Sequence, residues 1–150
     1  MLKYTNWAIV FREIPDEVSL AINIAGCPIH CPDCHSKELW DNKGTDLSAN
    51  ELTKLIKDNP GITCVLFMGG DRDPSSVNIL SFVVKQMFPL LKTAWYSGSE
   101  KLNNLEYLDY IKIGPYIKDK GPLDNPNTNQ RLYKMHYGKI VEDITYKFWK

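Results

Sequence analysis

One stretch organises this chain of 150 residues: Val18-Ser-Leu-Ala-Ile-Asn-Ile24-Ala-Gly-Cys27-Pro-Ile-His-Cys31-Pro-Asp-Cys34. Its first part has large apolar residues at every second position, which is the period of a β-strand. Its second part holds three of the four cysteines of the chain, spaced Cys-x3-Cys-x2-Cys. The stretch therefore predicts a strand that carries a cysteine loop at its carboxyl end, where parallel α/β folds place their chemistry.

The cysteine triplet suits a metal cluster better than a disulfide framework, because its three thiolates close on one loop. A [4Fe–4S] cluster normally takes four cysteines, so three leave one iron open, as at a catalytic metal site. A structural zinc would instead use His30 or His35 as a fourth ligand. Zinc sites usually draw paired ligands from two separated stretches, and this sequence has no second such pair. An iron–sulfur cluster is the favoured interpretation, with zinc or unligated thiols as the alternatives.

The composition is that of an ordinary folded domain, with 43% hydrophobic and 24% charged residues. Lys plus Arg equals Asp plus Glu, 18 each, so no net charge attracts nucleic acid or an anionic membrane. The N-terminus is too polar for a signal-peptide core, and no apolar stretch reaches membrane-spanning length. We therefore expect one domain over residues 1–150, a cytoplasmic location that keeps thiols reduced, and no nucleic-acid or membrane partner.

Local signals in the first part of the chain predict a strand, a turn and a helix. The apolar run at 7–11 predicts a strand near the edge of a sheet, and residues 15–17 predict a turn. Ser48 and Glu51 form a capping-box pattern, which predicts a helix that stops at 59–61.

The middle of the chain predicts a buried strand that leads into a second helix. Ile62–Met68 is a continuous apolar run, typical of a strand covered on both faces, and Gly69-Gly70-Asp71 follows it. Asp73 as N-cap and Pro74 at the first helical position predict a helix. Apolar residues then recur at helical spacing, namely Val77, Leu80, Val83, Val84, Met87 and Phe88.

Further strands are expected at 90–96 and 107–113, with a short helix at 99–106 between them. The segment 118–128 predicts a loop, and the tail is expected to turn as a hairpin near Gly138. This alternation predicts an α/β fold with a mostly parallel sheet, right-handed crossovers and extra edge strands at the termini. The units are too few for a closed eight-stranded barrel.

Three groups of motifs resemble those of one family. The first is Cys27-Pro-Ile-His-Cys31-Pro-Asp-Cys34-His-Ser with Leu39-Trp40 after it. The second combines Met68-Gly-Gly-Asp71 with Trp95-Tyr-Ser-Gly98, and the third is Thr128-Asn-Gln130. In this order, over roughly residues 18–133, they resemble the anaerobic ribonucleoside-triphosphate reductase activating proteins, which are radical S-adenosylmethionine (SAM) enzymes.

The resemblance implies a partial (βα) barrel of the radical SAM type with two cofactors, a [4Fe–4S] cluster and SAM. The cluster ligands implied are the three thiols of the triplet, Cys27, Cys31 and Cys34. Two further residues would flank the cluster on the nucleotide side and three would contact the methionine part of SAM: Asp33, His35, Gly69, Gly70 and Asp71.

The activity implied is that of a glycyl-radical-generating activase, which is an oxidoreductase. An external reductant gives one electron to the cluster, and SAM is then cleaved to methionine and a 5′-deoxyadenosyl radical. That radical abstracts a hydrogen atom from a glycine of the large reductase subunit. The chain departs from the family in reading Phe11–Glu17 where a glycine-rich stretch is usual, and Asp33 where glycine is frequent. Two alternatives stay open: an activase of another glycyl-radical enzyme or another small radical SAM enzyme, and a non-catalytic zinc or iron–sulfur module.

Anaerobic reconstitution should load about four irons and four sulfides per chain, because three thiolates hold a cuboid cluster. Elemental analysis of the desalted protein measures this. Cys27→Ala should lose most of the iron, whereas Cys64→Ala should keep it, since Cys64 lies within an apolar run outside the triplet. Stoichiometric zinc without iron uptake would contradict the iron–sulfur interpretation.

Overall fold

The computed structural model of the chain describes residues 2–25, 44–99, 105–115 and 117–149. Its strands, in chain order, are β1 Lys3–Val10, β2 Ser19–Ile24, β3 Thr45–Asp46, β4 Cys64–Met68, β5 Lys92–Tyr96, β6 Tyr110–Ile113, β7 Arg131–His136 and β8 Lys139–Asp143. Its helices are α1 Ala49–Lys57, α2 Pro74–Met87 and a short 3₁₀ helix, η2, at Thr145–Phe148. These elements confirm the predicted strands and two helices, whereas the helix expected at 99–106 falls largely outside the described residues.

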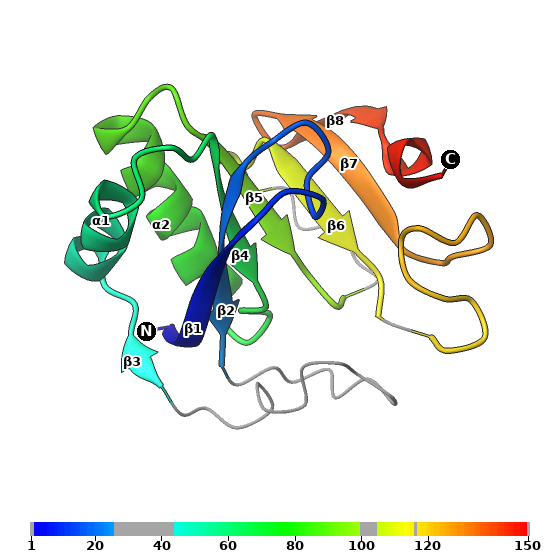
Figure 1. The fold of residues 1–150 in the computed structure, drawn as a ribbon, viewed down its shortest axis with the longest axis horizontal. Helices are drawn as coiled ribbons and strands as arrows, with labels where there is room; N and C mark the ends of the chain where they lie inside the picture. The colour runs from blue at the N-terminus through cyan, green and yellow to red at the C-terminus, as the bar shows by residue number, and fades with distance from the viewer. Residues whose placement is uncertain (1, 26–43, 100–104, 116, 150) are drawn as a thin grey trace.

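The described strands form one mixed sheet in the order β3-β1-β2-β4-β5-β6-β7-β8. The central pairs β2–β4, β4–β5 and β5–β6 are parallel, and the pairs on either side of them are antiparallel. Figure 1 shows α1 and α2 together on one face of this sheet. The β7–β8 hairpin forms the edge of the sheet that lies farthest from β3. The sheet is not a closed barrel, and its assignment to the radical SAM partial barrel stays a prediction. No helix of the described ranges is long and apolar enough to cross a membrane.

Helix α1 begins where the capping pattern predicts. The Ser48 hydroxyl accepts a hydrogen bond from the backbone N–H of Glu51 at 3.1 Å, which satisfies one free donor of the first turn. The Glu51 carboxylate accepts a hydrogen bond from the Tyr4 hydroxyl at 3.1 Å. The same short stretch therefore fixes the start of the helix and ties it to β1.

Helix α2 also begins as predicted, with Pro74 in its first turn and the Asp73 side chain accepting from the N–H of Ser76 at 3.3 Å. Its buried face is narrower than the sequence pattern suggested. Met87 shares the helical spacing of the apolar residues, yet it is 56% exposed and borders an open hollow between the helix ends. Val83 is only partly buried. The residues buried on this helix are Val77, Leu80, Ser81 and Val84.

The central strands β2, β4, β5 and β6 are buried on both faces of the sheet. On the helix face, the large residues of β2 pack with side chains of α1 and α2. The small residue between them, Ala21, belongs to a second core on the opposite face, together with Cys64 and Leu66. Cys64 is confirmed as a buried core thiol, and burial raises its pKa to about 12.

The segment 11–17 closes the second core. The activating proteins that the sequence resembles usually carry a glycine-rich stretch at this point. Ile14 is fully buried there. Two tyrosines hold the segment: the hydroxyl of Tyr96 donates to the backbone oxygen of Glu13, and that of Tyr110 donates to the Glu17 carboxylate at 3.1 Å. Burial, and then the Glu17 charge, raises the pKa of Tyr110, so its hydroxyl keeps the proton that it donates.

Ile14→Ala should lower the free energy of unfolding by about 2–5 kcal/mol, because it removes a fully buried side chain and leaves a cavity. Chemical denaturation measures the change. The control is Ile79→Ala, since Ile79 is 60% exposed on α2 and its loss should change stability by no more than about 0.5 kcal/mol. Similar small effects at both positions would show that segment 11–17 does not close a core.

Candidate functional site

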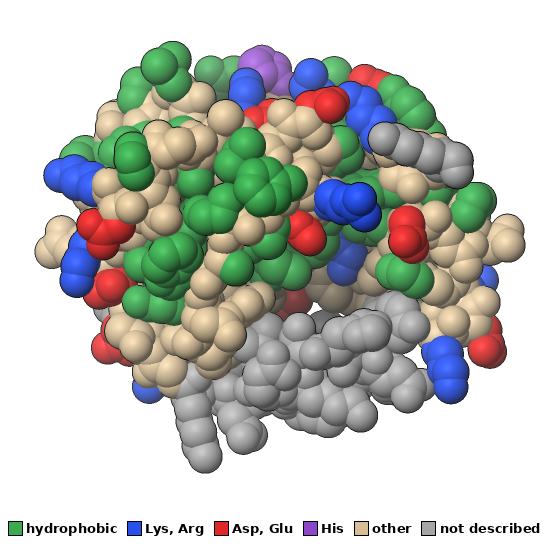
Figure 2. All heavy atoms as spheres, in the orientation of Figure 1, with side chains coloured by type: hydrophobic (Ala, Val, Ile, Leu, Met, Phe, Trp, Pro, Cys, Tyr) green, Lys and Arg blue, Asp and Glu red, His purple; other side chains and the backbone are tan. Residues whose placement is uncertain are grey.

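The carboxyl ends of four parallel strands share one edge of the sheet. Across β2, β4, β5 and β6, Asn23 pairs with Met68, Met68 with Tyr96, and Tyr96 with Lys112. Because these pairs are in register, the loops that follow the strands begin at the same level. Figure 2 shows the face of the sheet turned away from the helices, which is hollowed toward this edge, with acidic and basic side chains at the border.

Gly69 and Gly70 follow β4 with φ angles of +102° and +93°, in the left-handed region that favours glycine. A Cβ added to Gly69 would lie 3.0 Å from the backbone oxygen of Ile24, the last residue of β2. The Gly-Gly-Asp loop thus passes directly against the strand end from which the cysteine loop continues. A Cβ on Gly70 would instead point into the core, 3.1 Å from Val77 Cγ2.

Asp71 joins the loop after β4 to the loop after β5. One of its carboxylate oxygens accepts from the Ser97 hydroxyl, and the other accepts from the Gly98 N–H at 3.0 Å. A carboxylate offers about four acceptor positions, and the described residues use two of those of Asp71. The sequence singled out Asp71 and did not reveal these partners, although Ser97-Gly98 ends the neighbouring strand.

The hydrogen bonds at this edge continue from β5 to β7. The backbone oxygen of Ser99 accepts from the N–H of Gly114 at 2.7 Å. Gln130 Nε2 donates to the oxygen of Gly114 at 3.3 Å, and Asn129 Nδ2 donates to that of Pro115 at 3.1 Å. We call this bonded series the rim; its members are Asp71, Ser97, Gly98, Ser99, Gly114, Pro115, Asn129 and Gln130. The rim gives Asn129 and Gln130 the structural role that sequence reasoning could not assign.

Arg131, the next residue, contacts side chains outside the rim. Its guanidinium forms an ion pair with the Asp143 carboxylate at 2.7 Å and lies 5.6 Å from the centre of the Trp149 ring. These contacts join β7 to β8 and to the C-terminal segment.

Lys112 lies at the same edge, at the carboxyl end of β6, and sequence reasoning did not single it out. It is buried, its Nζ donates to the backbone oxygen of Ser97 at 3.1 Å, and the same Nζ lies 5.4 Å from the centre of the Tyr96 ring. A lysine inside an apolar strand was the available signal, because lysines are almost never fully buried without a partner. Its positive charge and the negative charge of Asp71 both contact Ser97.

Trp95 has the packing role that its place in the strand suggests. Its side chain is fully buried in the core on the helix face, and Nε1 donates to the oxygen of Gly69 at 2.6 Å. The indole therefore holds the Gly-Gly-Asp loop from the helix face of the sheet.

Five of the predicted site residues lie in 26–43, outside the described residues: Cys27, Cys31, Asp33, Cys34 and His35. Gly69, Gly70 and Asp71 are described and lie together at the carboxyl edge, and their contacts with SAM stay predictions. In the part of the chain that the structure describes, no group of three or more His, Cys, Asp or Glu residues could hold a metal ion.

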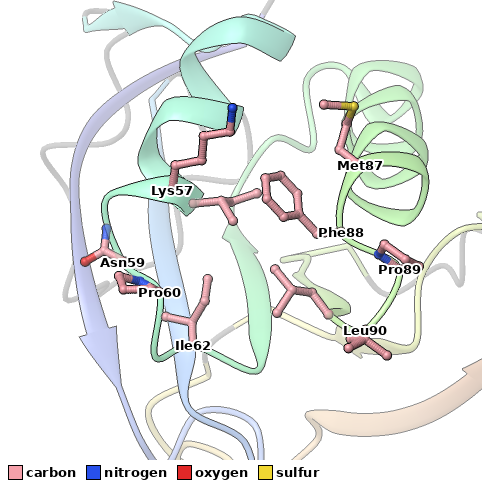
Figure 3. Close-up of a pocket in the computed structure, with 10 residues that line it drawn as sticks. Lys57, Asn59, Pro60, Ile62, Met87, Phe88, Pro89 and Leu90 are labelled. Atoms are coloured by element: carbon pink, nitrogen blue, oxygen red, sulfur yellow. The ribbon is translucent and has the colours of Figure 1, made fainter.

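An apolar hollow of about 450 Å³ lies at the other end of the sheet (Figure 3). It opens between the ends of α1 and α2, where Ile62 precedes β4 and Leu91 precedes β5. Phe88 and Met87 line it from the side of α2. It therefore belongs to the amino ends of the strands and is separate from the site that the motifs predict.

Three closely spaced cysteines follow β2 in the sequence, and such a set supplies the donors of an iron–sulfur cluster. The comparison with known families agrees: residues 18–133 match the family described as the 4Fe-4S single cluster domain. The chain belongs to that family. The matched range includes the cysteine triplet, the Gly-Gly-Asp loop and the rim. No curated protein and no solved structure matched the chain.

Gly70→Ala should lower the free energy of unfolding by about 1–3 kcal/mol, because alanine strains a left-handed backbone and its Cβ would crowd Val77. Urea denaturation measures the loss. Gly61→Ala is the matched control: an added Cβ there meets nothing within 4 Å, and stability should stay level or rise by up to about 1 kcal/mol. A loss at Gly61 as large as at Gly70 would contradict the assigned geometry.

Proposed function

We propose that this iron–sulfur protein is a radical SAM activase that cleaves SAM reductively and generates a glycyl radical on the anaerobic ribonucleoside-triphosphate reductase. The observation that carries the proposal is the close approach of the Gly-Gly-Asp loop to the end of β2, the strand that precedes the cysteine triplet in the sequence. An added Cβ at Gly69 would lie 3.0 Å from the oxygen of Ile24, three residues before Cys27. A ligand that binds the open iron of a cluster on the triplet would therefore meet the Gly-Gly-Asp loop.

The residues present suit the two cofactors. Cys27, Cys31 and Cys34 supply three thiolates for a [4Fe–4S] cluster and leave one iron for SAM. When bound, the reduced cluster supplies the electron that breaks the C5′–S bond of SAM. The protein has to hold SAM in one orientation while this happens, because the cofactors carry the chemistry and the chain carries the positioning.

The described residues can orient the amino-acid end of SAM by charge. That end carries an ammonium and a carboxylate, and the described residues at this edge include a carboxylate, Asp71, and an ammonium, Lys112. The Asp71 carboxylate accepts from the hydroxyl of Ser97, while Lys112 Nζ donates to the backbone oxygen of the same residue. Opposite charges held on either side of one residue match a zwitterion better than a neutral ligand.

The partner and the external reductant follow from the family resemblance, and the fold supports a large partner. A loop of another protein needs an open approach to the reacting atoms. The sheet is not closed, and its face opposite the helices is hollowed toward the carboxyl edge (Figure 2). A glycine loop of the reductase would enter from this face.

Cluster-loaded protein incubated anaerobically with SAM and dithionite should form 5′-deoxyadenosine, measured by chromatography. Asp71→Asn should keep its iron and reduce kcat/KM for SAM by about 10- to 100-fold, because it removes a charged hydrogen-bond acceptor. Asp46→Asn is the control, since Asp46 is exposed on β3 outside the site. Iron-loaded protein that never cleaves SAM would leave a non-catalytic iron–sulfur module as the function.

The partner is tested with the wild-type protein. Mixed with SAM, reductant and the large subunit of the anaerobic reductase from the same cell, it should give the doublet of a glycyl radical by electron paramagnetic resonance. The doublet should collapse when the glycine is α-deuterated. SAM cleavage without a radical in the reductase would assign the same chemistry to another glycyl-radical enzyme or another substrate.

A further inference from the structure

The hollow between the ends of α1 and α2 has a lining that is almost free of polar groups. Its volume is about 450 Å³, and the side chains that line it are apolar apart from Lys57 and Asn59. Asn59 is already bonded, because its Nδ2 donates to the backbone oxygen of Leu55 at 2.8 Å. Figure 3 shows the amide of Asn59 pointing away from Phe88, on the outer side of its loop. Lys57 is thus the one lining side chain whose polar group is left for an occupant.

Such a lining suits apolar side chains of a protein better than it suits a small molecule. Pockets for small ligands usually combine an apolar wall with a few polar groups that converge on the ligand and fix its orientation. The centre of a protein interface is instead depleted of charge and enriched in aromatic residues and methionine. Phe88 and Met87 line this hollow, and its one charged residue, Lys57, is exposed.

An apolar projection stands beside the hollow, in the same surface. Leu90 is 93% exposed, the largest value among the exposed large hydrophobic residues that the structure describes. It lines the hollow together with Met87, which is 56% exposed, and both are labelled in Figure 3. A surface that carries an apolar projection and an apolar hollow is complementary to a second copy of itself. A two-fold axis would form the same contact twice, once in each direction.

The charges at the border of the hollow match a second copy as well. Lys57 ends α1 and Asp58 follows it, and both residues are exposed. A purely acidic or purely basic partner would repel one of these two charges. A second copy offers the opposite charge to each of them, and complementary charges of this kind fix the register of an interface. The border therefore favours a second copy over a partner of a single charge sign.

We propose that the hollow and Leu90 form the centre of a two-fold interface between two copies of this chain. Leu90 of each copy inserts into the hollow of the other, with Lys57 and Asp58 at the border. The hollow lies at the amino ends of the strands, and β4, which has five residues, separates it from the carboxyl edge. At about 3.3 Å per residue this separation is roughly 16 Å. Pairing at the hollow therefore leaves the carboxyl edge of each copy uncovered.

Sedimentation velocity of the cluster-loaded protein at a series of concentrations tests the interface. Wild type should change from the mass of one chain to that of two as the concentration rises. Leu90→Asp should weaken this association roughly 30-fold or more, because it places a carboxylate in the apolar centre of the interface. Its fold should persist, since Leu90 is 93% exposed. Val141→Asp is the matched control: Val141 is 60% exposed on the edge strand β8, and this variant should associate as wild type does.

Two results of this experiment would overturn the proposal. One is wild-type protein that stays a single chain at every concentration. The other is Leu90→Asp that associates as tightly as wild type, because the two copies would then meet through another surface.

Hydroxyl-radical labelling of the wild-type protein locates the interface without any variant. Labelling of Met87 and Leu90 should fall as the concentration rises and pairs form. Labelling of Phe11 and Val141, which are 68% and 60% exposed outside the hollow, should stay constant. Paired chains in which Met87 and Leu90 are labelled as strongly as in single chains would contradict the proposed contact.

A small apolar ligand is the competing occupant, and the dye anilinonaphthalene sulfonate serves as its probe. Equilibrium dialysis should show that the amount of dye bound per chain falls as the protein concentration rises, because the partner's side chain fills the hollow. Wild type that stays a single chain and binds the dye equally at all concentrations would assign the hollow to a small ligand and overturn the proposal. None of these measurements uses SAM, so their outcome is independent of the proposed activity.

Discussion

In-register parallel pairing of β2, β4, β5 and β6 is the constraint on which the rest of the structure depends. The three pairs set Asn23, Met68, Tyr96 and Lys112 side by side across the sheet. A slip of one residue in any pair would turn the side chains of that strand to the opposite face and shift the loop that follows it. Burial on both faces prevents such a slip, because either face would then present the wrong side chains to its core.

Both cores stabilise this register, one on each face of the sheet. The helix-side core contains the large residues of the strands, including Phe67 and Trp95, and supplies most of the buried bulk. The opposite core uses small residues in the strands, such as Ala21 and Ala94, and is closed by Ile14 from segment 11–17. At the carboxyl ends of the strands the same face carries the larger side chains of Met68 and Tyr96.

Polar groups at the edge are held before any ligand arrives. Asp71 is fixed by Ser97 and Gly98, and Lys112 is fixed by Ser97 and the ring of Tyr96. Burying a lysine is costly unless it is hydrogen-bonded or lies against an aromatic face, and Lys112 has both kinds of contact. Charges that are already oriented cost little reorganisation on binding, which is what the proposed cleavage of SAM would require.

The sequence by itself determined the local elements and the chemistry of the cysteine loop. Ser48 and Asp73 start their helices as predicted, and the hairpin turns at Tyr137-Gly138, two residues with positive φ. These features depend on interactions within a few residues, which composition and spacing reveal. The cysteine spacing likewise indicated an iron–sulfur protein, in agreement with the family to which the chain belongs.

Only the tertiary structure decided which distant residues meet. Asp71 contacts Ser97 across 26 positions, and Gln130 contacts Gly114 across 16, because strand register brings their loops together. The exposure of Met87 could not be predicted from the sequence either. Its helical spacing is that of a buried residue, and it is exposed because it borders the hollow between the helix ends. Periodicity says which side of an element is apolar; the packing of the other elements says where that side is covered.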